Sequence, residues 1–393
     1  MRLKKKLANS VLYSFLLASM GTQVVEAGAT EQAKRMHDRL VGIPPSDTTL
    51  NSMATKIADG EPIDAAYEAM DNPVFYSATL KDFASPWTNR DQSVFVDLND
   101  FTATVIGVVR DDVPFNFLLS EDIAYIGSAA ASNNVDYSQT DNNHYLELQN
   151  NNVDLSDPNN LVRVKQTELP GNTLPASATA GVTTTRGFAQ SFLQAGTNRA
   201  ALNAVTTNFL CKNMEDLRDI TARPEFVRQD VTRSPGGDSD IFFNDCLSCH
   251  AGMDALAGAH AYYDFDEDTQ QIVYTAGQVQ PKYLQQAGTF RYGYATTDDR
   301  WINYWRNGPN SYLGWNGFED SGNGAKSLGE ELATTRQFAE CQVQQVFEQI
   351  CYRTPNGEAD LLAVANIATR FEQNRSYSMK RVFAETATYC MGE

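Results

Sequence analysis

Two cysteines and a histidine share one short stretch, Cys246-Leu247-Ser248-Cys249-His250. The pattern C-x-x-C-H is the attachment signature of c-type haem, in which two thiols bond to the porphyrin vinyl groups and the adjacent imidazole ligates the iron. The two-residue gap places both sulfurs at one edge of the porphyrin. We therefore predict one covalent haem c, held by Cys246 and Cys249, with His250 as the proximal iron ligand.

The same two thiols have rival uses, as a redox dithiol or as half of a zinc site. A zinc site would want a second pair of ligands, and the chain has only four His and no other C-x-x-C. A dithiol of the thioredoxin type would follow a strand, whereas residues 240–245 are typical of a short helical lead-in. Both rival uses stay open as alternatives.

The sixth iron position needs a ligand from elsewhere in the chain. Met253 lies only three residues beyond the proximal ligand, on the same side of the ring, so we expect it to pack in the core. We choose His144 as the distal ligand. It lies in the polar stretch 142–145, and we expect a loop there that can reach the haem face with its imidazole free. Any Met, or an open or water-bound position, remains an alternative.

Other side chains could also surround the iron. His37 has charged neighbours on an expected helix, which indicates a surface position. His260 follows the proximal ligand by ten residues, where a continuing helix would hold it on the wrong face. Guanidinium groups pair bidentately with carboxylates and could bind the haem propionates, with surface salt bridges as the alternative role. The candidates for this are Arg228, Arg233 and Arg291.

The N-terminus predicts export. Basic residues at positions 2 and 4–6 precede an apolar run over 11–20, and Val25-Glu26-Ala27 suits cleavage after Ala27. The apolar run is too short to span a membrane, and no later stretch approaches ~20 apolar residues. We therefore predict a signal peptide over residues 1–27 and a mature protein in the periplasm or outside the cell.

The charge balance limits the partners. The chain has 31 basic and 49 acidic residues, a formal net charge of −18. Such a surface repels nucleic acid and anionic lipid, so we expect neither as a partner. A basic redox protein would suit it, and the sequence leaves the oligomeric state open.

The other cysteines predict disulfides, because an even number remains in an exported protein. They are Cys211, Cys341, Cys351 and Cys390. If residues 327–352 form one helix, Cys341 and Cys351 are about 15 Å apart at ~1.5 Å per residue, too far for a disulfide. Helices over 327–352, 358–374 and 377–389, arranged up, down and up, would bring Cys351 to Cys390. The pairs are then Cys351–Cys390 and, by exclusion, Cys211–Cys341.

The pattern of the whole chain predicts a mainly α, multi-helical haem protein with long irregular loops and a small β-hairpin. After the signal peptide we expect an N-terminal helical region (28–126), a polar loop-rich segment (127–180), a haem c domain (181–326) and a C-terminal three-helix segment (327–393). The hairpin is expected around Tyr262 to Tyr274, and an aromatic helix over residues 301–306.

Several segments resemble an uncharacterised group of exported, cytochrome c-like proteins that is common in planctomycetes and also occurs in proteobacteria. The matching segments are residues 110–119, 181–184, 208–211, 246–254, 328–341 and Phe347. The most specific is C-x-x-C-H-x-x-M-D at 246–254. The resemblance implies a largely helical haem protein. Many members carry an extra N-terminal cytochrome domain with its own C-x-x-C-H, which this chain lacks.

These observations predict an exported mono-haem c-type cytochrome that passes electrons to or from a partner protein. Removing 27 of 393 residues leaves 366, far more than one haem carrier needs. That excess keeps two alternatives open. One is a haem c oxidoreductase, peroxidase-like or acting on a small organic substrate. The other is a cell-surface interaction protein in which the haem is structural.

Overall fold

The computed structural model describes residues 28–194, 196–227, 239–283, 294–317, 320–373 and 376–392. Across these residues helices predominate, and the strands form small two-stranded antiparallel sheets. The predicted mainly α fold with a small hairpin is confirmed. The predicted signal peptide and the three propionate candidates, Arg228, Arg233 and Arg291, lie outside the described residues.

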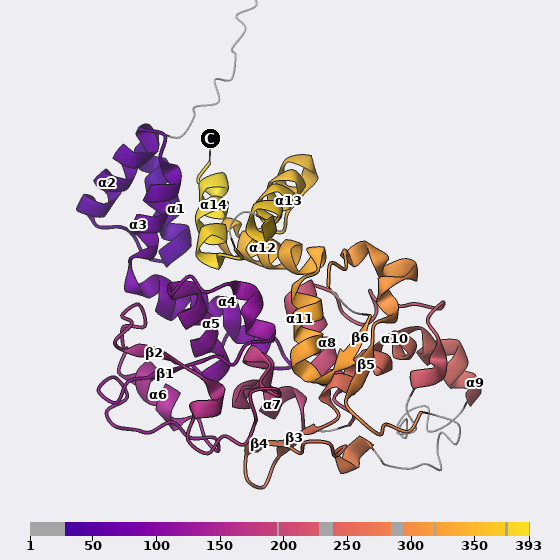
Figure 1. The fold of residues 1–393 in the computed structure, drawn as a ribbon. Coiled ribbons are helices and arrows are strands. Elements are labelled where there is room, and N and C mark those ends of the chain that lie inside the picture. The colour runs from indigo at the N-terminus through magenta and orange to yellow at the C-terminus, as the bar shows by residue number, and fades with distance from the viewer. Residues whose placement is uncertain are drawn as a thin grey trace, which may run out of the picture.

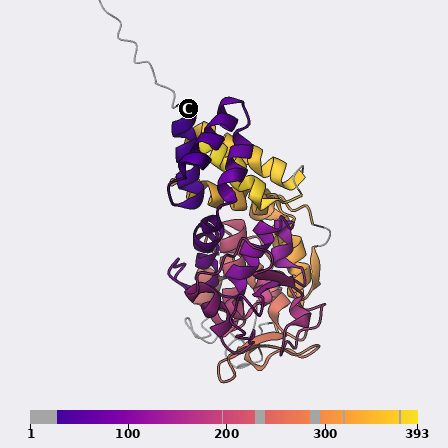
Figure 2. The same cartoon turned by 90° about the vertical axis from the view of Figure 1, so that its left-hand side faces the viewer.

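Both ends of the described chain meet at one end of the molecule (Figures 1 and 2). The first helices are α1 (Ala29–Val41), α2 (Asp47–Ala58) and α3 (Pro62–Met70), and of these α1 and α3 pack against α14 (Met379–Cys390). Gly42 ends α1 in a left-handed conformation, with φ 81°. Gln32 Nε2 donates to the carbonyl of Gly392 at 2.9 Å, and Arg35 Nη1 donates to that of Met391 at 2.7 Å. These bonds join the first helix to the chain's C-terminal residues.

The C-terminal helices are α11 (Gly324–Ala333), α12 (Arg336–Cys351), α13 (Gly357–Gln373) and α14. The expected single helix over 327–352 is wrong, because Thr335 interrupts it. Its hydroxyl donates to the Leu332 carbonyl at 2.8 Å and accepts from the Phe338 N–H at 3.0 Å, so it caps α12 instead of continuing α11.

Both predicted disulfides are confirmed. Cys351 pairs with Cys390 at a Cα separation of 5.6 Å, and Cys211 pairs with Cys341 at 5.3 Å. Cys341 and Cys351 lie within the one helix α12, so the argument against their pairing survives the break before it.

The middle of the chain is built around α5 (Asp100–Arg110), which follows α4 (Leu80–Ala84). The Asn99 side chain caps α5 by accepting from the Thr102 N–H at 3.0 Å. Strands β1 (Ala124–Gly127) and β2 (Leu161–Val164) pair beside it. Between these strands lies a helix that the polar composition did not predict, α6 (Asn143–Asn150).

The remaining strands form two hairpin-like pairs. β3 (Tyr263–Asp266) and β4 (Gln271–Tyr274) make the predicted hairpin. The aromatic helix expected over 301–306 is wrong, because β5 (Arg300–Ile302) pairs with β6 (Ser321–Asn323) and only a 3₁₀ turn follows. Trp301 Nε1 donates to Ser327 Oγ at 2.8 Å, and a Cβ at Gly322 would lie only 2.7 Å from the Trp301 ring. Tertiary packing of the Trp301 indole therefore stabilises a strand at residues 300–302 instead of the expected helix.

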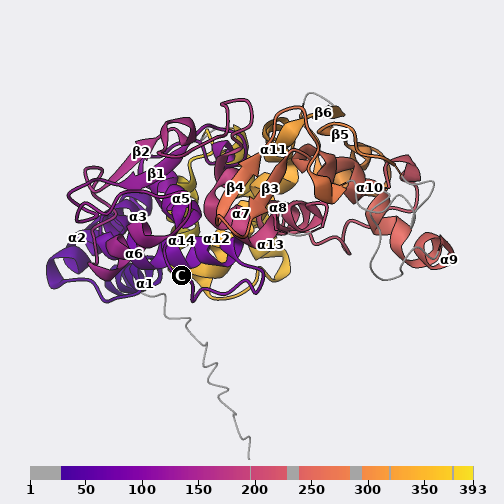
Figure 3. The same cartoon turned by 90° about the horizontal axis from the view of Figure 1, so that it is seen from below.

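The predicted haem motif lies at the other end of the molecule from α1 to α3 (Figures 1 and 3). The elements there are α8 (Arg199–Leu210), α9 (Ser239–Ile241) and α10 (Leu247–Ala257), while α7 (Arg186–Phe192) lies nearer the middle, beside α5 and β4. A π-helical turn, Phe242–Cys246, joins α9 to α10, so the expected helical lead-in is confirmed. Helix α10 packs against α8. Among the described residues, no helix has both the length and the apolar character that crossing a membrane requires.

Candidate haem site

The two cysteines of the motif lie where the π-helical turn passes into α10. Cys246 ends that turn and Cys249 lies in the first turn of the helix; both are half-buried and unpaired. Cys246 packs with Leu247 and Val227, and Cys249 Sγ lies 3.5 Å from the carbonyl oxygen of Met214. Burial, helped by the nearby Asp245 and Cys249, raises the pKa of the Cys246 thiol. The environment therefore favours a protonated thiol at this position.

His250 follows on the same helix and faces a carboxylate one turn further along. Its Nδ1 lies 3.4 Å from Asp254 Oδ1 and 3.5 Å from Oδ2, while 22% of its side chain is exposed. The spacing i to i+4 on a helix puts these two side chains on one face. The imidazole thus turns its Nδ1 edge towards Asp254.

Asp254 is held in turn by an arginine from another helix. Arg199, the first residue of α8, donates from Nε to Oδ1 at 2.6 Å and from Nη2 to Oδ2 at 2.8 Å. The Asp254 side chain is fully buried, whereas 21% of Arg199 is exposed. Burial would raise the pKa of Asp254, but the charge and hydrogen bonds of Arg199, with those of His250, hold it well below its usual range. The carboxylate is therefore ionised and fixed between the two side chains.

The rest of α10 is anchored in the protein. Residues 251–257 are all buried, including Met253, which confirms that Met253 packs in the core. A Cβ at Gly252 would lie 2.1 Å from Trp305 Nε1, so glycine allows the indole to approach the helix backbone. The helix is thus fixed along most of its length, while Cys246, Cys249 and His250 at its start stay partly accessible.

These residues match what a haem c needs. The two thiols are unpaired although the other four cysteines form disulfides, and the imidazole presents its Nδ1 edge to a carboxylate, as metal-ligating histidines commonly do. Among the described residues, no group of three or more His, Cys, Asp or Glu side chains is placed to hold a metal ion.

Comparisons of the chain with protein-family models, with curated proteins and with solved structures found no match. The resemblance to cytochrome c-like proteins therefore stays an expectation from the sequence.

The structure does not bring His144 to this site. His144 lies on α6, far along the molecule from α10 (Figure 3). Its Nε2 accepts from the Gly127 N–H at 2.8 Å and its Nδ1 donates to the Val135 carbonyl at 2.7 Å, in a buried position. The expectation of a loop histidine with a free imidazole is therefore wrong, because backbone groups engage both ring nitrogens. We withdraw His144 as the distal ligand.

The other two histidines outside the motif are also buried. His37, expected at the surface, is 2% exposed, with its Nδ1 2.9 Å from the Ile43 carbonyl oxygen, so that expectation is wrong. His260 is 3% exposed, in a 3₁₀ turn directly after α10.

Sequence reasoning did not identify Arg199 and Asp254 as functional residues. The spacing of His250 and Asp254 was visible in the sequence as an i, i+4 pair within an expected helix. Nothing local indicated Arg199, which is 55 positions from Asp254 and reaches it only through the packing of α8 on α10.

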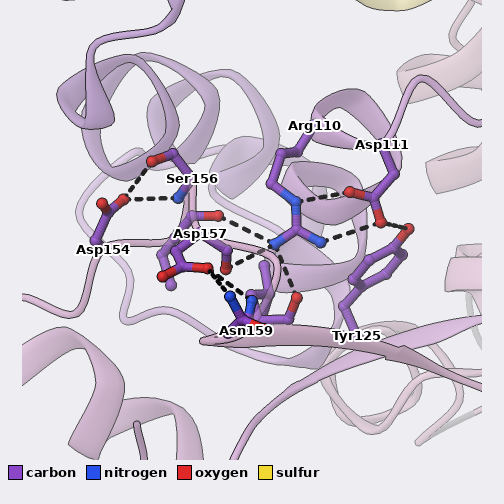
Figure 4. Close-up of polar contacts among 9 residues, drawn as sticks. Arg110, Asp111, Tyr125, Asp154, Ser156, Asp157 and Asn159 are labelled. Atoms are coloured by element: carbon purple, nitrogen blue, oxygen red, sulfur yellow. Dashed lines mark hydrogen bonds and ion pairs between the residues drawn. The ribbon is translucent and has the colours of Figure 1, made fainter.

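A second arginine–aspartate cluster provides a reference for this one (Figure 4). Arg110, at the end of α5, binds the Asp111 carboxylate through Nε at 2.7 Å and Nη2 at 3.0 Å. Its Nη1 donates to three backbone carbonyls of the segment 155–161, the nearest being that of Leu161 at 2.8 Å. The Tyr125 hydroxyl donates to Asp111 Oδ2 at 2.7 Å. All these partners are backbone groups or side chains of neighbouring elements, so this cluster ties a loop to α5.

Proposed function

We propose that the protein is an exported mono-haem c-type cytochrome that passes electrons to or from a partner protein. The observation that carries the proposal is which of the six cysteines form disulfides and which do not. Four form disulfides, while Cys246 and Cys249 stay unpaired and partly accessible beside His250. Disulfides suit the periplasm or the cell exterior, where unpaired neighbouring thiols would be exposed to oxidation unless a cofactor used them.

Each residue of the site has a defined part in this proposal. Haem c supplies a centre that gains and loses one electron. Cys246 and Cys249 would fix the porphyrin edge, His250 would ligate the iron, and the buried part of α10 would keep these groups in place. The donor set is small but complete for covalent attachment and one axial bond.

The charge of the chain supports a protein partner of opposite sign. A formal net charge of −18 attracts a basic surface and speeds encounter at low salt. We therefore expect electron exchange with a basic redox protein to slow as ionic strength rises, because screening weakens this attraction.

The second candidate is a haem c oxidoreductase, and the contact of His250 with Asp254 favours it. A carboxylate behind the proximal imidazole makes the imidazole a stronger donor to iron, which stabilises oxidised states of the metal. The size of the chain also leaves room for a substrate site. No feature of the described residues specifically favours the third alternative, an interaction protein with a structural haem.

Covalent haem is tested first. The purified protein, made in a host that matures c-type cytochromes, should give a haem-stained band at the chain's mass on a denaturing gel. The band should be absent in the variant Cys246→Ala/Cys249→Ala. The matched control, Cys351→Ala/Cys390→Ala, removes two cysteines that form a disulfide and should keep the stain in whatever protein is recovered. Haem that acid–acetone extracts from the unmodified protein would overturn the proposal.

Visible and electron-paramagnetic-resonance spectra then separate the carrier from the enzyme. A six-coordinate, low-spin iron that does not react with peroxide supports the electron carrier. A high-spin iron that reacts supports the oxidoreductase, because a substrate or peroxide needs an open coordination position.

A further inference from the structure

The carboxylate beside His250 is held far more tightly than helix stability requires. An exposed i, i+4 pair contributes little and needs no third partner. Asp254 is instead completely buried, and it accepts two hydrogen bonds from one edge of the Arg199 guanidinium, from Nε at 2.6 Å and from Nη2 at 2.8 Å. Burying an ion pair is costly unless its geometry is well satisfied. The arrangement therefore indicates a role that depends on where the carboxylate sits.

That position is defined by α8 and α10 together. Arg199 begins α8, and its fork leaves the Asp254 oxygens almost equally distant from His250 Nδ1, at 3.4 and 3.5 Å. The imidazole is the partly exposed member of the group. A group ligated through its other nitrogen would thus have a fixed anion behind it.

We propose that Asp254, positioned by Arg199, orients the proximal His250 and lowers the reduction potential of the haem. The inference rests on the proposed function. An Nδ1–H directed at a carboxylate gives the imidazole partial imidazolate character and strengthens its donation to iron. The ferric state carries one more positive charge than the ferrous state. A nearby negative charge therefore stabilises the ferric state more.

Asp254 is a positioning residue in this proposal, since it acts through His250. A purely structural role for the pair would change stability and leave the potential of the folded holoprotein unchanged. The two roles therefore separate in a measurement of the midpoint potential on variants that retain covalent haem.

The test compares Asp254→Asn with the unmodified holoprotein by spectroelectrochemical titration at neutral pH. Asparagine keeps the shape and an acceptor but removes the charge. We expect the midpoint potential to rise. At a fixed applied potential the ferrous-to-ferric ratio should increase at least tenfold, which corresponds to about 59 mV for one electron. Asp254→Glu keeps the negative charge, so its midpoint potential should lie between those of Asp254→Asn and the unmodified protein. Asp111→Asn removes the corresponding carboxylate of the Arg110 cluster and should leave the potential unchanged.

The outcomes are distinct from those of the proposed function. A pyridine haemochrome spectrum first establishes whether the unmodified protein carries haem c, and its absence would overturn both proposals. With haem c present, an unchanged potential in Asp254→Asn would overturn the inference alone. If Asp254→Asn yields no folded holoprotein, Arg199→Lys takes its place. It keeps the positive charge but breaks the fork; we expect a smaller shift of the same sign, and no shift would overturn the inference.

Discussion

Two arginine–aspartate pairs of similar geometry lie on different elements, one at the end of α5 and the other between α8 and α10 (Figures 1 and 3), and they bury opposite charges. In the Arg110 cluster the cation is buried, with 6% of its side chain exposed, while 31% of Asp111 is exposed. In the pair beside the haem motif the anion is buried completely, and 21% of Arg199 is exposed. The buried member of each pair has a different second partner.

The two pairs differ in the group that the buried residue contacts besides its ion-pair partner. The buried Arg110 also binds backbone carbonyls, so its remaining donors hold a loop in place. The buried Asp254 faces an imidazole that is itself partly exposed and adjoins two unpaired thiols. A similar ion pair thus ties a loop to α5 in one place and, in our proposal, supports the proximal iron ligand in the other. The difference comes from what the buried charge can reach.

The largest expected effect concerns the disulfide that anchors α8. Cys211 caps the end of α8 opposite Arg199 and joins it to α12. The two cysteines are 130 positions apart, so Cys211→Ala/Cys341→Ala should lower the free energy of unfolding by about 5 kcal/mol. Urea unfolding followed by circular dichroism measures this loss. Hydrogen exchange should quicken more in α8 and α10 than in α5, because only the first two depend on that anchor.

A matched control is the other disulfide, which is 39 positions apart and does not touch α8. Cys351→Ala/Cys390→Ala should cost about 4 kcal/mol by the same loop-entropy argument. If hydrogen exchange quickens equally in α5 and α8 after loss of the Cys211–Cys341 disulfide, the prediction is wrong. The disulfide would then stabilise the whole fold rather than α8 and α10 in particular.

The next expected effect contrasts the two carboxylates directly. Asp254→Ala removes the buried acceptor of the Arg199 hydrogen bonds and should lower the free energy of unfolding of the haem-free chain by about 3 kcal/mol. Asp111→Ala should cost only about 1 kcal/mol, because Asp111 is partly exposed and Arg110 keeps its backbone acceptors. Chemical denaturation of both variants under one set of conditions gives the comparison. Equal losses would contradict the assignment of the buried charge as the difference between the clusters.

Local signals in the sequence were enough for several parts of the fold. The ends of α1 and α5 depend on nearby residues, since Gly42 and Asn99 act within a few residues of each helix end. The disulfides followed from helix rise and from which helix ends can meet. The hairpin β3–β4 also depends on a short turn. In each case the residues that determine the structure are close together in the sequence or are tied by simple geometry.

The failures share a different cause. His144 has polar neighbours in the sequence, yet its partners are backbone groups of residues 127 and 135, and it is buried by tertiary packing. Trp301 has strong aromatic neighbours, yet strand pairing with Gly322 fixes its conformation. The haem motif itself was recognisable because its chemistry is local. Its support by Arg199 was not, because that contact spans two helices far apart in the chain.

The smallest expected effect tests the structural clamp through pH. Burial raises the pKa of Tyr125, and its hydrogen bond to Asp111 and the charge of that carboxylate raise it further. A group whose pKa is raised on folding contributes stability that is complete below its unfolded pKa, near 10 for tyrosine, and is lost as the pH rises towards the folded value. Tyr125→Phe removes both the hydrogen bond and this dependence. It should therefore cost about 1 kcal/mol at pH 8 and less at pH 10.5.

Urea unfolding at the two pH values measures the difference between Tyr125→Phe and the unmodified chain. Tyr312→Phe, at a half-exposed ring, is the matched control and should leave the stability unchanged at both values. Tyr125→Phe should also leave any haem spectrum unchanged, because Tyr125 belongs to the Arg110 cluster. A cost that stays constant from pH 8 to pH 10.5 would show that the Tyr125 hydroxyl stabilises the clamp only by packing. The ion pair of Arg110 and Asp111 would then hold the loop without help from the Tyr125 hydroxyl. In that case the Arg110 cluster would resemble the pair of Arg199 and Asp254 more closely.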